Sequence, residues 1–133
     1  MEREYINPPD ICPPPANMYH HVVKVGNQVF IAGQVSRDME GRTLHPNDPA
    51  AQVREVWSNI AKALESVGGT TRDIVRTTTY VVGAENLAEV RRARLEDMPA
   101  DGLPTSTTLV VAGLAAPDLL VEVEVAAILE GNG

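Results

Sequence analysis

The sequence predicts a single α+β domain in which two helices cover one face of a β-sheet. Three observations predict this class. Two β-rich segments are linked by a short turn, two later segments have helical periodicity, and three further β-rich segments lie before and after the second helical segment. A chain of 133 residues fits one domain and can bury a core without disulfides or metals. Because two helices cannot cover both faces of such a sheet, one face should be open to water or to partners.

The first 18 residues differ in composition from the rest of the chain. Five of the ten prolines lie at positions 8, 9, 13, 14 and 15, where they remove backbone donors and helical freedom. We interpret residues 1–18 as an extended, proline-rich arm and residues 19–133 as the single domain. A disordered terminus and an ordered arm, lying on the domain or on a neighbouring subunit, both stay open.

A hairpin and a helix follow the arm. Residues 22–25 and 28–33 are β-rich, and the Gly26-Asn27 pair between them tolerates positive φ. After a polar loop over residues 34–46, apolar side chains recur at spacings of three and four over residues 48–67, which predicts a helix. Within it, Asp48 is suited to capping the start.

The second half of the chain predicts a strand, a helix and two more strands. Residues 73–82 are β-branched, residues 85–98 have a mixed helical stripe, and residues 105–112 and 119–129 have strand character. In the last strand, alternation places four small apolar side chains on one face: Val121, Val123, Val125 and Ala127. The opposite face mixes apolar side chains with two carboxylates, which suits a subunit interface.

Composition excludes several classes of protein and favours a cytoplasmic one. A net charge of −7 and 4% aromatic residues argue against nucleic acid as a partner. Cys12 is the only cysteine, and His20 and His21 point opposite ways on a strand, so we expect no disulfide and no metal site. No apolar run is long enough to cross a membrane, and the basic start and apolar stretch of a secretory signal are not seen.

An ordered set of residues resembles the Rid/YjgF (reactive intermediate deaminase) family. The set comprises Tyr19 with Gly26 seven residues on, Ala32-Gly33-Gln34, Gln52 with Asn59, and the closing run Val121-Glu122-Val123-Glu124-Val125-Ala126. The resemblance covers residues 19–128 and implies a chorismate-mutase-like sandwich, a mixed β-sheet packed on two helices. It also implies a homotrimer with a central β-barrel and small-molecule ligand clefts between subunits.

Family deaminases hydrolyse 2-imino or enamino acids without a metal or cofactor, so the resemblance implies no cofactor here. Their motif is a Pro, a small residue and an Arg, whose guanidinium can grip a substrate carboxylate through two hydrogen bonds. In this chain the stretch is Pro104-Thr105-Ser106, so Ser106 stands at the arginine position. A hydroxyl supplies no positive charge, and the usual 2-imino acid deaminase activity is therefore doubtful.

The candidate site comprises one catalytic and four substrate-binding residues. Glu122 matches the glutamate that helps to hold the attacking water, and we take it as the catalytic candidate. For substrate binding we take Tyr19, Ser106, Thr108 and Arg91, where Arg91 lies near a position that approaches the cleft in relatives. Arg76, Arg91 and Arg94 all stay open as replacements for the missing arginine.

Two hypotheses of function follow, and both stay open. The first is a cofactor-independent hydrolase of the deaminase type, acting on an imine, an enamine or a related compound. The alternative is a non-catalytic trimer that binds a metabolite or regulates a partner. A ribonuclease, a label that some relatives carry, is disfavoured by the net charge of −7.

Overall fold

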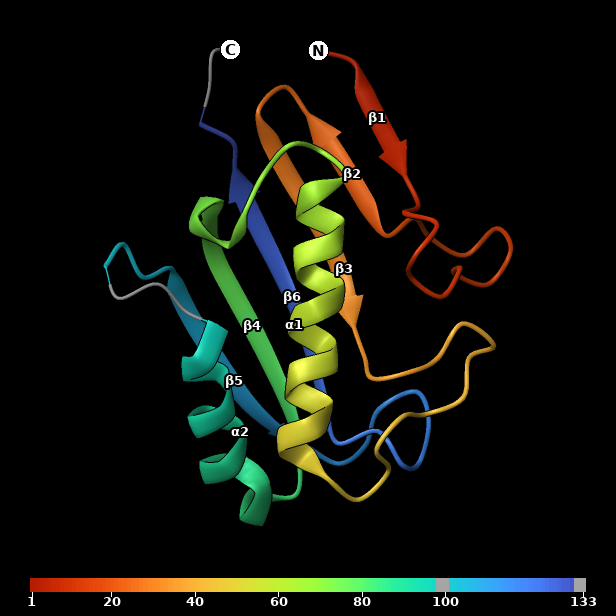
Figure 1. The fold of residues 1–133 in the computed structure, drawn as a ribbon, viewed down its shortest axis with the longest axis vertical. Coiled ribbons are helices and arrows are strands. Elements are labelled where there is room, and N and C mark those ends of the chain that lie inside the picture. The colour runs from red at the N-terminus through yellow and green to blue at the C-terminus, as the bar shows by residue number, and fades with distance from the viewer. Residues whose placement is uncertain (98–100, 131–133) are drawn as a thin grey trace.

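A computed structural model describes residues 1–97 and 101–130 of the chain (Figure 1). The elements in chain order are β1 (Arg3–Ile6), β2 (Val22–Val25), β3 (Gln28–Gln34), α1 (Pro49–Glu65), β4 (Ile74–Val82), α2 (Leu87–Arg94), β5 (Thr105–Val111) and β6 (Val121–Ile128). Short 3₁₀ turns precede β4 and flank α2. Neither helix within these residues is long and apolar enough to cross a bilayer.

The six strands form one mixed sheet in the order β1-β2-β3-β6-β4-β5. Only β4 and β5 pair in parallel, and all the other neighbours are antiparallel. Both helices lie on the same side, with α1 along the middle of the sheet and α2 beside its β4–β5 end (Figure 1). The predicted two-helix α+β sandwich, with one sheet face left open, is confirmed.

The core lies between α1 and the sheet because the two hydrophobic periodicities meet there. Every third or fourth side chain of α1 is buried, and so are the alternate side chains of β6 that were assigned to one face. The Asp48 side chain caps α1 by accepting from the Ala51 backbone N–H at 3.1 Å. Buried Gln52 donates to the carbonyls of His45 and Asp118 and accepts from the Leu120 N–H.

Strand β1 was not expected within the proline-rich arm. Residues 3–6 pair antiparallel with β2, and Ile11 is buried in the core. The sequence around β1 is charged and has no hydrophobic alternation, so its pairing depends on the free edge of β2 rather than on a local pattern. In this structure residues 3–6 thus form the edge strand of the sheet.

Helix α2 is shorter than the predicted segment 85–98. Gly83 adopts a φ of 85°, and a 3₁₀ turn at Ala84–Asn86 delays the helix start to Leu87. The α-helix ends at Arg94 and continues as a 3₁₀ turn to Asp97. The predicted last residue, Met98, lies outside the described residues.

Candidate active site

Glu122 lies on the open face of the sheet, at the start of β6. Its register partner on β4 is Tyr80, and β3 lies on its other side. The carboxylate rests against Gly33: a Cβ added at Gly33 would lie 2.8 Å from Glu122 Cδ and 3.0 Å from Cγ. Real side-chain contacts are longer than this, so only a glycine leaves room for the carboxylate at this place.

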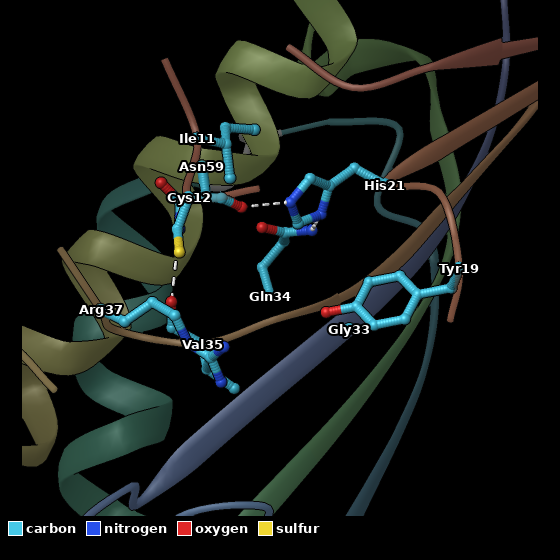
Figure 2. Close-up of a pocket in the computed structure, with 9 residues that line it drawn as sticks. All are labelled: Ile11, Cys12, Tyr19, His21, Gly33, Gln34, Val35, Arg37 and Asn59. Carbon is cyan, nitrogen blue, oxygen red and sulfur yellow. Dashed lines mark hydrogen bonds between the residues drawn. The ribbon is translucent and has the colours of Figure 1, made fainter. Parts of the chain in front are cut away.

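A small pocket opens beside Gly33, at the C-terminal end of β3 (Figure 2). Its cavity of about 20 Å³ has room for one ordered water. Tyr19 lines it, 44% exposed, with its ring edge-on to the His21 ring at a centroid distance of 5.9 Å. Buried His21 is fixed through both ring nitrogens, Nε2 to the Cys12 carbonyl at 2.7 Å and Nδ1 to Gln34 Nε2 at 3.1 Å.

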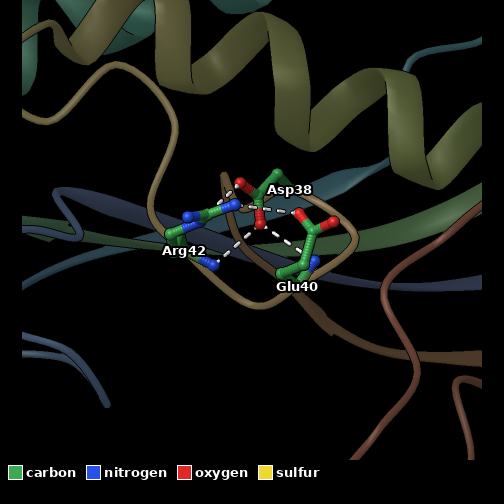
Figure 3. A network of polar contacts seen from close by, with 3 residues as sticks. All are labelled: Asp38, Glu40 and Arg42. Atoms are coloured by element: carbon green, nitrogen blue, oxygen red, sulfur yellow. Dashed lines mark hydrogen bonds and ion pairs between the residues drawn. The ribbon is translucent and has the colours of Figure 1, made fainter.

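The loop after β3 brings a cation to the same pocket. Arg37 lines the pocket and exerts an electrostatic influence on the Glu122 carboxylate. The next residue, Asp38, holds the loop turn: it accepts from the backbone N–H groups of Glu40 and Arg42, each at 2.9 Å, and from Arg42 Nε at 3.3 Å (Figure 3). The bond from the Arg42 backbone N–H contributes most to lowering the pKa of Asp38, because these hydrogen bonds favour the ionised carboxylate.

Burial raises the pKa of Glu122 above the ordinary value of 4.5. The negative charge of Glu124 acts in the same direction, and Arg37 opposes both. The Tyr80 hydroxyl donates a hydrogen bond to the Glu124 carboxylate at 2.9 Å. A half-buried carboxyl group with raised proton affinity, beside a polar pocket, is suited to general acid–base chemistry.

This raised pKa predicts a pH dependence of stability. Between 4.5 and the raised pKa, the folded chain keeps a proton that the unfolded chain releases, so stability falls as pH rises through this window. We expect Glu122→Gln to remove this fall and to gain stability relative to the wild type between pH 4 and neutrality. Urea unfolding at several pH values and one fixed protein concentration measures it, with exposed Glu65→Gln as control. A difference between Glu122→Gln and wild type that stays constant with pH would contradict the assignment.

Ser106, Thr108 and Arg91 do not lie with Glu122 and Tyr19. Ser106 is the register partner of Thr77, whose side chain is buried beneath the helices, whereas Glu122 pairs with Tyr80 on the open face. Alternation therefore places Ser106 and Thr108 on the helix-covered face. With Arg91 they line a groove between α2 and β5. The predicted site residues thus form two separate groups in one chain.

The third candidate cation, Arg76, lies elsewhere. It is exposed on β4 and lines a hollow with Phe30 and Thr105. Arg94 is the residue that contacts Ser106: its Nη1 donates to Ser106 Oγ at 2.9 Å. Sequence reasoning did not predict Arg37 or His21 as pocket residues, because a loop arginine and a histidine just before β2 have no periodic signal. A glycine inside a strand, as at Gly33, was the available sign of a close approach.

Within the described residues, no group of three His, Cys, Asp or Glu side chains is placed to hold a metal ion. Fold and site together define a small α+β protein with a half-buried carboxylate over a strand glycine on the open side of its sheet. Comparison with known proteins places this arrangement in a family. The family model described as endoribonuclease L-PSP matches residues 11–129.

The chain therefore belongs to the Rid/YjgF family, which the endoribonuclease L-PSP model describes. A RutC family protein from Pyrococcus abyssi is 30% identical over 118 residues, which are 89% of this chain and 91% of the relative. The crystal structure of the Rid family protein YyfA from Yersinia pestis matches with a TM-score of 0.87 at 25% identity, over 96% of this chain and 100% of that one. RidA from the Antarctic bacterium Psychrobacter sp. PAMC 21119 matches with a TM-score of 0.80 at 28% identity, over 90% and 95%.

Proposed function

We propose that this protein is a homotrimeric, cofactor-independent hydrolase that releases ammonia from a small imine or enamine, with Glu122 as the catalytic group. The observation that carries this proposal is the Glu122 carboxyl group itself. It is half-buried, its pKa is raised, and it is seated on Gly33 beside a cavity with room for a single water. Membership of the Rid/YjgF family supports the same chemistry.

The proposed reaction needs one water and no redox step. Glu122, as carboxylate, takes a proton from water while the water oxygen bonds to the imine carbon and the C=N π electrons move to nitrogen. The protonated Glu122 then returns the proton to nitrogen. This gives a carbinolamine with one hydroxyl and one amino group. Glu122, again a carboxylate, takes the hydroxyl proton and passes it to the amino nitrogen, so that the C–N bond breaks as the C=O bond forms and ammonia leaves. A raised pKa suits Glu122 to these proton transfers.

The separation of the two residue groups supports a cleft between subunits. A ligand that touches Glu122 and Tyr19 cannot also reach Ser106 and Thr108 of the same chain, because the sheet lies between the two groups. The outer edge of β5 has no partner strand within the described chain, so a neighbouring subunit has room to approach there. A trimer with its clefts at such contacts brings the two groups together.

Two measurements on the purified protein test the proposal. Sedimentation equilibrium should give three times the chain mass. Ammonia release should be measured on a panel of imines, generated in solution by oxidation of amines and of amino acids, so that the panel contains members with and without a carboxylate. We expect the protein to accelerate ammonia release from the imines with a carboxylate, from those without one, or from both. No acceleration on either set, with a metabolite still stabilising the trimer, would instead indicate the non-catalytic binding protein.

A further inference from the structure

The guanidinium of Arg94 lies between the end of α2 and the β4–β5 edge of the sheet. Nη1 donates to Ser106 Oγ at 2.9 Å, and Nη2 donates to Thr77 Oγ1 at 3.1 Å. In Figure 1, α2 lies beside β4 and β5, so the side chain bridges helix and sheet. These two hydroxyl groups are neutral, and neither compensates the positive charge.

No carboxylate among the described residues forms an ion pair with Arg94, although the side chain is half-buried. Its Nε is fully buried and has no acceptor within the described part of the chain. Burial lowers the pKa of Arg94, which records the unfavourable desolvation of an uncompensated charge. Arg91 and Arg92 line the same groove and add like charge. An anion in the groove would compensate this positive charge.

The other polar groups of this groove can donate as well. Ser106 Oγ accepts from Arg94, so its own hydrogen remains available to a ligand. Thr108, two residues along the same face of β5, also lines the groove. The groove has a volume of about 450 Å³. On β4, in register with Thr108, Thr79 Oγ1 is a second buried polar atom without a partner among the described residues.

Stabilisation of the helix end explains only part of this group of arginines. Cations in the last turn of a helix stabilise its negative end, and Arg91 and Arg92 are exposed there. Arg94 differs because it turns onto the sheet, where its hydrogen bonds to Ser106 and Thr77 hold it half-buried. Of its five N–H groups, two make these bonds and the Nε–H is buried, which leaves one N–H on each Nη for a ligand.

We propose that the α2–β5 groove binds a small oxyanion, such as a carboxylate, with Arg94 as the residue that determines this specificity. Guanidinium N–H groups and the Ser106 hydroxyl present donors on one side, and a carboxylate has two oxygens to accept from them. The proposal concerns binding and does not rest on the proposed hydrolysis. It implies that a cation from α2, rather than from the strand that holds Ser106, gives the groove its charge.

The wild-type protein should be titrated with sodium acetate, with inorganic phosphate and with acetamide as a neutral control, at constant ionic strength. NMR of the Arg94 Nε–H signal and the thermal midpoint report binding. Acetate should shift both saturably, and acetamide should shift neither. Saturation by phosphate alone would support the site and assign it to tetrahedral oxyanions. No saturable shift by either anion, or an equal shift by acetamide, would overturn the proposal.

Variants of the groove residues show which side chains bind the anion. Arg94→Gln should weaken anion affinity at least about tenfold, because a charge-assisted bond is lost, and Arg94→Lys should lie between it and wild type. Arg72→Gln removes the same charge at an exposed position and should bind like wild type. Ser106→Ala, which keeps Arg94, gives a second weakened variant should Arg94→Gln not fold. Equal affinity in Arg72→Gln, Ser106→Ala and any folded Arg94 variant would contradict the assignment.

Discussion

Gly33→Ala lowers the rate of hydrolysis about a hundredfold and leaves the fold intact. The added Cβ would meet the Glu122 side chain, whose Cδ would lie only 2.8 Å away. Because the carboxylate is the free end of a flexible side chain, it moves rather than the backbone, and the loss falls on activity. Displacement of a reacting group by about 1 Å can cost a hundredfold in rate. Steady-state ammonia release and thermal unfolding together measure the two parts of this prediction.

A double-mutant cycle shows whether the loss acts through Glu122. In a Glu122→Gln background, Gly33→Ala should cause little further loss, because the carboxylate it displaces is already gone. Gly113→Ala is the matched control, since a Cβ there meets no atom within 4 Å. Full activity of Gly33→Ala, or losses that simply add in the double variant, would show that the close approach has no part in catalysis.

Glu122→Gln lowers kcat by about a hundredfold to ten-thousandfold, the range for removal of a general acid–base. The substituted amide is close in size and can hold a water, but it cannot take a proton from it. Exposed Glu65→Gln has the same change of charge and should keep wild-type activity. Steady-state kinetics on the best substrate of the imine panel give the comparison. A kcat within twofold of wild type would show that Glu122 is not the catalytic group.

The parts of the fold that sequence predicts are those whose burial imposes a periodicity. Helix α1 and strand β6 are predicted because their apolar side chains repeat at helical or strand spacing. Strand β1 escapes prediction because an exposed edge strand needs no apolar face. The early start of the predicted second helix has a related cause: the positive φ of Gly83 and the turn after it leave no signature in hydrophobic spacing.

The candidate site is predictable only as a set of residue types. The resemblance marks Glu122, Tyr19 and Ser106, but strand parity and sheet order decide that Ser106 faces the helices while Glu122 faces the open side. Which arginine replaces the missing one depends on side-chain direction at the end of α2. Sequence leaves three candidates, and only Arg94 donates a hydrogen bond to Ser106 in the structure.

The pH dependence of ammonia release tests the role of Glu122 most directly. In the free enzyme, kcat/KM should rise with pH through one ionisation above the ordinary 4.5, because burial and Glu124 raise the pKa of Glu122. Glu124→Gln should move this ionisation to lower pH by removing a negative charge, while leaving the plateau rate in place. A profile that lacks this ionisation, or one that Glu124→Gln does not move, would contradict the assignment of Glu122 as the catalytic base.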